Sequence, residues 1–159
     1  AAQKSIILKK DIASTDGKYD VISMWHVLEH VPDYNKQIKW LHSHLKTDGI
    51  LFIAVPNFKS YDAKIYKENW AAYDVPRHLH HFSQNGIQKI FAAHGFEIVK
   101  KRPLLLDAFY VSILSEKYKG SSLAFLKGLF AGTLSNIVAI KNSEYSSLLY
   151  ILKKQNADF

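Results

Sequence analysis

The segment WHVLEHVPD, residues 25–33, brings together residue types that could bind a metal ion. His26, Glu29 and His30 form the pattern H-x-x-E-H, the spacing of a zinc-hydrolase motif with two histidines one helical turn apart. That chemistry needs a sustained helix. Pro32 opposes one, because a proline clashes with the carbonyl four residues earlier and pushes the preceding residue out of helical geometry. We therefore predict at most one helical turn before Pro32, and no metal site.

A second polar cluster lies in YDVPRHLHHFS, residues 73–83. Histidine titrates near neutral pH, so His78 or His81 could be the base that removes a proton from an acceptor, with Arg77 orienting an acidic substrate. In the alternative interpretation, Asp74 pairs with Arg77 to hold the loop and the histidines are buried uncharged. A metal site here would need a further ligand, and the sequence offers no clear one. The catalytic and the structural interpretations both stay open.

The alternation of apolar runs and amphipathic stretches predicts an α/β fold. The run ILFIAV, residues 50–55, is apolar throughout, as in a strand buried on both faces of a parallel sheet. Ser83 is placed to begin a helix as its N-cap, and Gly95 to end it. This order favours a layered fold with a largely parallel sheet, whose ligands bind beyond the carboxyl ends of the strands. The predicted strands are 5–8, 19–24, 50–55, 96–100 and 147–152, and the predicted helices are 34–45, 84–94, 105–118 and 121–140, with 58–83 irregular.

Composition excludes several classes of function. The 159 residues include no cysteine, so disulfides, thiolate zinc sites and a cysteine nucleophile are excluded, and a cytoplasmic location is expected. The formal net charge is +7, and most of the excess lies in residues 100–159. Only two of the 21 basic residues are arginines and the lysines are scattered, so we predict no nucleic-acid partner.

Two longer patterns resemble a known family. YDVISMWHVLEHVPD, a helix, and then LKTDGILFIAVPN resemble the C-terminal half of a class I S-adenosylmethionine-dependent methyltransferase, with Thr47 and Asp48 in place of the usual Pro-Gly. DVPRHLHHFS followed by HGFEIV resembles the branch related to ubiquinone biosynthesis and other small-molecule methylases. The resemblance covers about residues 10–103. It implies direct, in-line methyl transfer from S-adenosylmethionine to a small or lipid-like acceptor.

The same resemblance implies positions for the cofactor. Trp25 and His26 lie where the family's loop after the fourth strand lines the cofactor cleft, and Asp11 and Ile12 lie near the point where the adenine is usually held. In ubiquinone-type O-methyltransferases this loop reads E-x-x-E-H, and its acidic residues are associated with a divalent metal. Here His26 stands at the first position, and imidazole favours softer metals than magnesium, so we carry over no metal ligand.

The family's N-terminal pattern, a strand and a glycine-rich turn, has no match among the seven glycines of this chain. We therefore expect a Rossmann-like methyltransferase sheet lacking its first strands, with a C-terminal helical insertion before a last antiparallel strand. The expected parts are 1–103 (the C-terminal part of the methyltransferase domain), 104–145 (a helical insertion or cover) and 146–159 (last strand and tail). The innermost strand would have an open edge, which favours self-association. The alternative is a non-catalytic α/β fragment acting as an interaction or dimer module.

The segment SSLAFLKGLFAGTLSNIVAI, residues 121–140, carries one charge, Lys127, and an apolar stripe at helical spacing. Gly128 and Gly132 are four residues apart, a spacing that allows helices to pack closely. Three interpretations are open: a cover that takes an apolar acceptor, a segment that attaches to a membrane surface, and a plain core or dimer helix. The serines, Asn136 and Lys127 oppose a membrane-spanning helix.

Overall fold

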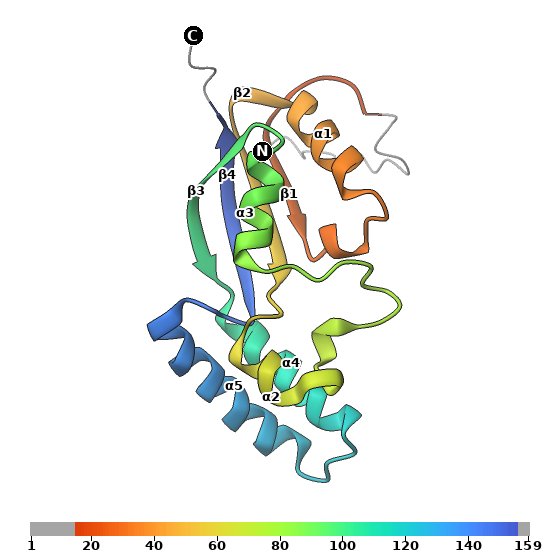
Figure 1. Cartoon of the computed structure of the whole chain (residues 1–159), viewed down its shortest axis with the longest axis vertical. Coiled ribbons are helices and arrows are strands. Elements are labelled where there is room, and N and C mark those ends of the chain that lie inside the picture. The colour runs from red at the N-terminus through yellow and green to blue at the C-terminus, as the bar shows by residue number, and fades with distance from the viewer. Residues whose placement is uncertain (1–14, 156–159) are drawn as a thin grey trace, which may run out of the picture.

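The computed structural model describes residues 15–155 of the chain (Figure 1). The predicted strand 5–8 lies outside these residues, and every other predicted strand and helix is present with ends that differ by a few residues. The elements run in the order β1 (Tyr19–Trp25), α1 (Tyr34–His44), β2 (Leu45–Pro56), α2 (Tyr61–Tyr66), α3 (Gln84–Ala92), β3 (Phe96–Pro103), α4 (Leu105–Tyr118), α5 (Ala124–Asn142) and β4 (Ser147–Lys154).

The segment 58–83 was predicted to be irregular, and this was wrong in part. It contains the short helix α2 and two 3-10 turns, Lys67–Asn69 and Ala71–Tyr73. The hydroxyl of Ser60 accepts a hydrogen bond from the Ala63 backbone N–H at 3.3 Å and so begins α2. A helix of six residues is too short to show a helical period in the sequence, because the period needs about three turns to be recognised.

The four strands form one mixed sheet in the order β1-β2-β4-β3. β1 and β2 run parallel, with Met24 opposite Ile53, whereas β4 runs antiparallel to both of its neighbours. The expected antiparallel last strand is therefore confirmed. The prediction of a largely parallel sheet is wrong, because β4 lies between β2 and β3 and pairs antiparallel with both.

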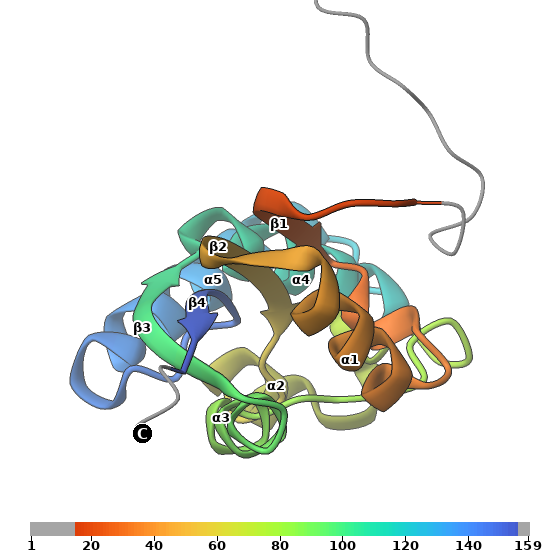
Figure 2. The ribbon, with the colours of Figure 1, turned by 90° about the horizontal axis from the view of Figure 1, so that it is seen from above.

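Two apolar clusters hold the fold together. The larger lies between the sheet and the helices α1 and α3, and the smaller lies among α2, α4, α5 and the turns after α2. Helices α2, α4 and α5 gather at the end of the sheet where β1 and β2 finish (Figure 1), and the view from above shows α1 and α3 beside the strands (Figure 2). The carboxyl ends of the two parallel strands therefore face the helical layer.

Strand β1 lies at the edge of the described sheet and pairs with β2 alone. Its Val21 side chain remains 55% exposed. An edge of this kind presents unpaired backbone N–H and C=O groups to other chains. The open edge expected from the sequence is thus present within residues 15–155, and self-association through it stays a prediction.

Helices α4 and α5 form a hairpin within the segment 104–145, and β4 follows it. A Cβ atom built on Gly128 would lie 2.4 Å from the Cα of Ile113, and one built on Gly132 would lie 2.9 Å from the Cα of Phe109. These contacts are with the backbone of α4, which cannot move aside as a flexible side chain can. The two glycines therefore allow α4 and α5 to approach closely.

Replacing Gly128 with valine should lower the free energy of unfolding by about 2–3 kcal/mol, because the added atoms force the two helices apart. Chemical denaturation followed by circular dichroism measures the change. Gly86→Ala is the control: its Cβ would meet the Ser83 hydroxyl at 3.3 Å, and alanine favours the helix. A loss below about 1 kcal/mol for Gly128→Val would contradict tight packing of the hairpin.

Candidate functional site

The loop after β1 turns sharply at His26. This residue has a φ of 50°, in the left-handed region, and its backbone N–H donates to the Ala54 carbonyl at 3.0 Å. A single 3-10 turn, Leu28–His30, follows and ends before Pro32. The prediction of at most one helical turn is confirmed, so His26 and His30 do not lie on one sustained helix. Trp25 ends β1 with its side chain 52% exposed.

Two carboxylates flank the imidazole of His26. Its Nε2 lies 3.0 Å from Oδ2 of Asp107 on α4, and its Nδ1 lies 3.4 Å from Oε1 of Glu29, whose side chain is fully buried. The interaction with Asp107, then that with Glu29, raises the pKa of His26 to about 9 against the opposing effect of burial. His26 is therefore an imidazolium at neutral pH, which suits it to hold these carboxylates rather than to act as a base.

The ion pairs of His26 predict a pH-dependent stability. Folding raises the pKa of His26 from 6.5 to about 9, so the stabilisation is fully present below pH 6.5 and is lost as the pH rises through about 9. We expect the difference in unfolding free energy between wild type and His26→Gln to shrink over this range in urea titrations. His81→Gln is the control for loss of an exposed histidine outside these ion pairs. A difference that is constant with pH would contradict the two ion pairs.

The segment from Asp74 to His81 is hydrogen-bonded to the loop after β1. The Glu29 carbonyl accepts hydrogen bonds from the backbone N–H groups of Leu79 at 2.8 Å and of His80 at 3.2 Å. The guanidinium of Arg77 donates to Oδ1 of Asp74 at 2.7 and 3.1 Å. The Asp74–Arg77 ion pair expected in the structural interpretation is therefore present. Arg77 also lines the cavity described below, where it could contact an acidic group of a ligand.

The two candidate bases are placed differently. His78 is almost buried, and its Nδ1 donates to the Ala72 carbonyl at 2.8 Å. Its Nε2 is then left to accept a proton, 3.9 Å from Oδ2 of Asp74 and 4.0 Å from Oε1 of Glu29. His81 is exposed and donates from Nε2 to the Tyr73 carbonyl at 2.9 Å. His78 lines the cavity described below, and His81 does not.

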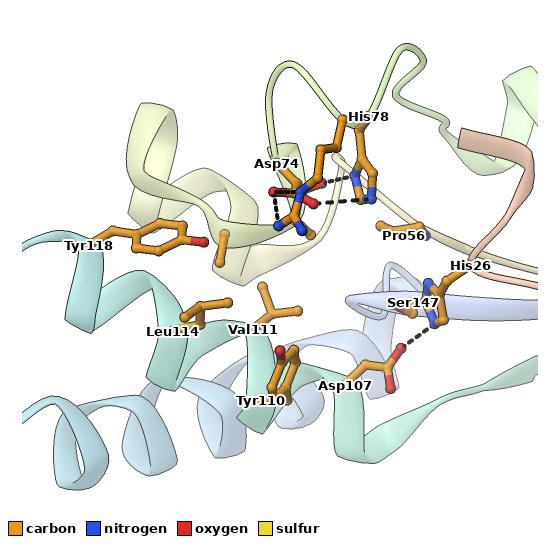
Figure 3. Close-up of a pocket in the computed structure, with 13 residues that line it drawn as sticks. His26, Pro56, Asp74, His78, Asp107, Tyr110, Val111, Leu114, Tyr118 and Ser147 are labelled. Atoms are coloured by element: carbon orange, nitrogen blue, oxygen red, sulfur yellow. Dashed lines mark hydrogen bonds and ion pairs between the residues drawn. The ribbon is translucent and has the colours of Figure 1, made fainter. Parts of the chain in front are cut away.

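A cavity of about 270 Å³ lies beside the carboxyl ends of β1 and β2, next to α4 (Figure 3). Its polar wall comes from the loop after β1, the segment 74–78 and the first turn of α4. The side chains that form this wall are those of His26, Asp74, Arg77, His78 and Asp107.

The remaining wall of the cavity is mostly apolar. Half of it comes from α4, and the rest comes from Pro56, Ala71, Ala72 and Ser147. Figure 3 shows Leu114 and Val111 with the rings of Tyr110 and Tyr118 projecting from this helix towards Asp74. The sequence did not predict these residues or Asp107 as parts of the site. No local pattern marks them, because they reach the site through the packing of α4 against segments about thirty or more residues away in sequence.

A group of three ligand atoms could hold a metal ion. Atoms of Glu29, His30 and His78 lie within 4.8 Å of one another. This group differs from the H-x-x-E-H motif, because His78 joins it in place of His26. The Nδ1 atoms of His30 and His78 bond to backbone carbonyls, so each ring would offer Nε2. The prediction of no metal stays untested. The predicted adenine contacts Asp11 and Ile12 lie outside the described residues.

The mixed α/β sheet with a polar cavity at its strand ends defines a class of fold that is shared by enzymes acting on small molecules. Residues 2–101 match the methyltransferase domain family. The chain therefore belongs to the class I S-adenosylmethionine-dependent methyltransferase domain family, as the sequence patterns predicted. Helices α4 and α5 lie beyond the matched residues.

The relatives of the chain are longer than the chain itself. It is 33% identical over 79 residues to the ubiquinone biosynthesis O-methyltransferase of Glaesserella parasuis serovar 5 (strain SH0165), a match that covers 48% of this chain and 34% of that protein. The magnesium protoporphyrin IX methyltransferase of Synechocystis PCC 6803, solved with bound SAH, has a TM-score of 0.53 at 17% identity. This alignment covers 93% of the present chain and 50% of that structure.

A second solved structure shares the same fold. The mycolic acid cyclopropane synthase solved with SAH and CTAB has a TM-score of 0.55 at 14% identity, covering 89% of this chain and 57% of that one. At these identities the likeness shows the fold alone. The chain thus spans about half the length of the structures that it matches and about a third of the curated relative.

Proposed function

We propose that this chain carries an acceptor site and the Trp25 and His26 side of a cofactor site for S-adenosylmethionine-dependent methyl transfer to a hydroxyl of a small or lipid-like acceptor. The observation that carries the proposal is the cavity at the ends of the parallel strands, where His78 offers Nε2 as a proton acceptor beside an apolar wall. Family membership supports the cofactor, since two matched structures contain SAH.

S-adenosylmethionine supplies an electrophilic methyl group on a sulfonium when it is bound. Trp25 and His26 follow β1 at the point where ligands bind in such sheets, so we assign them to the cofactor side. His78 would remove the proton of the acceptor hydroxyl, which leaves the hydroxyl oxygen as the nucleophile. The carboxylates of Glu29 and Asp74 stabilise the imidazolium that this step leaves on His78.

The other polar residues position the acceptor. The imidazolium of His26 holds Asp107 at one side of the cavity at 3.0 Å. Arg77 neutralises Asp74 and can meet an acidic group of the acceptor at the rim. The side chains of Leu114, Tyr110 and Tyr118 offer an apolar surface to the rest of the molecule. This distribution favours an amphipathic acceptor over a purely polar one.

The second candidate function is a non-catalytic interaction or dimer module. The exposed edge of β1 is the observation that favours it, because an unpaired edge strand can add a strand from another chain. The two functions differ in what they require. A module needs the edge and no cofactor, whereas the transferase needs the cofactor and the cavity.

Titration of S-adenosylhomocysteine into the 159-residue chain separates the two candidates. We expect micromolar binding by calorimetry and a change in tryptophan fluorescence that disappears in Trp25→Phe, because Trp25 is exposed at the end of β1. Trp40→Phe is the matched control, since Trp40 stacks on His44 at a centroid distance of 4.1 Å, away from the cavity. Absence of both heat and a fluorescence change would contradict a cofactor site on this chain and favour the module.

A further inference from the structure

Helix α5 presents an apolar stripe to the outside of the protein, interrupted by the exposed Thr133. Leu126, Phe130, Ile137 and Ile140 follow one another at intervals of four, seven and three residues, which places them on one helical face. Phe130 and Ile140 are each 73% exposed. From Leu126 to Ile140 the stripe extends about 21 Å at 1.5 Å per residue, whereas exposed apolar residues on an ordinary surface are usually scattered singly.

The opposite face of α5 is fixed to the protein. Gly128 and Gly132 pack against the backbone of α4, and the Ser135 hydroxyl donates to the buried carboxylate of Asp62 at 2.7 Å. By length and composition α5 is apolar enough to cross a membrane, which alone is weak support for a membrane contact. Because one face is held by the fold, a contact through the stripe would lie along the surface of a bilayer rather than span it.

The charge around the stripe is positive. Lysines of the hairpin, Lys117, Lys119, Lys127 and Lys141, are exposed, and none of them forms an ion pair with residues 15–155. Helix α5 contains no acidic residue. The two acids of the hairpin face inward, since Asp107 pairs with His26 and Glu116 is buried. The outward charge of the hairpin is therefore carried by lysines alone.

We propose that the α4–α5 hairpin docks on an anionic lipid bilayer, with the stripe of α5 buried among the acyl chains near the headgroups and the lysines on the lipid phosphates. A helix with an apolar face and flanking lysines has the composition that binds such surfaces. A second copy of the chain fits less well, because two stripes flanked only by lysines would bring like charges together. Docking needs neither the cofactor nor methyl transfer.

Vesicle flotation of the 159-residue chain tests the docking. Vesicles of phosphatidylcholine with about 30% phosphatidylglycerol should bind at least about tenfold more protein than vesicles of phosphatidylcholine alone, and salt at about 0.5 M should weaken the binding. The double variant Phe130→Ser with Ile137→Ser should lose at least about tenfold of the binding. Val99→Ser is its control, since Val99 is an exposed apolar residue on β3.

Charge reversal tests the lysines separately. Lys127→Glu with Lys141→Glu should reduce binding to the anionic vesicles by about tenfold, whereas Lys36→Glu with Lys39→Glu on α1 should leave most of it. Circular dichroism confirms that each variant is folded. Equal binding to neutral and anionic vesicles, or no loss in the stripe variant, would overturn the proposal. So would a dimer in sedimentation velocity that the stripe variant converts to a monomer, because the face would then join two copies.

Discussion

Replacing Asp62 with alanine should lower the free energy of unfolding by about 3–5 kcal/mol. Its carboxylate on α2 is completely buried and accepts three side-chain hydrogen bonds, each 2.7 Å long. The donors are the Trp70 indole N–H and the hydroxyls of Ser135 and Ser146. The variant leaves three buried donors without an acceptor, and each such group costs about 1–3 kcal/mol. Urea denaturation measures the loss.

The effect should extend to the placement of α5. Ser135 lies on α5 and Ser146 directly precedes β4, so the hydrogen bonds to Asp62 hold both against α2. We expect faster amide hydrogen exchange in α5 of the Asp62→Ala variant than in wild type. Asp48→Ala is the matched control, because Asp48 is exposed and its loss should change stability by less than about 0.5 kcal/mol. Equal stability of the two variants would contradict the role given to Asp62.

Replacing His78 with asparagine should reduce kcat for methyl transfer to a hydroxyl acceptor by about 10²–10³-fold, the usual contribution of a positioned base. Asparagine can keep the hydrogen bond to the Ala72 carbonyl that Nδ1 now makes, while it removes Nε2. The fold and the cavity should therefore persist. KM for the acceptor should change little, because the interaction that is lost belongs to the transition state.

The measurement is transfer of labelled methyl groups from S-adenosylmethionine to acceptors found in a screen of phenols and lipids. His81→Gln is the matched control: His81 belongs to the same segment and bonds to a backbone carbonyl through Nε2, but it does not line the cavity. Its kcat should equal that of wild type. Wild-type kcat in His78→Asn, or a larger loss in His81→Gln, would show that the base is elsewhere.

Much of the secondary structure was accessible from local pattern. The hydroxyl of Ser83 accepts from the Gly86 backbone N–H at 3.1 Å, and Asp33 caps α1 in the same way through Lys36 at 2.9 Å. Pro32 ends the preceding turn. These features depend on residues a few positions apart, so they can be predicted directly from the local sequence. The short helix α2 was missed, since its stability comes largely from the distant donors to Asp62.

The sequence by itself determined the positions of the strands and long helices, the family, and two of the segments that meet at the cavity. Tertiary structure decided which side chains meet there. Nε2 of His26 and Oδ2 of Asp107 are 3.0 Å apart although 81 positions separate the two residues. Nε2 of His78 can accept a proton because Nδ1 of the same ring donates to the Ala72 carbonyl. Such contacts arise from how β4 inserts into the sheet and how α4 packs across the strand ends. Local periodicity reports which residues face inward, but it does not report which distant element they will meet.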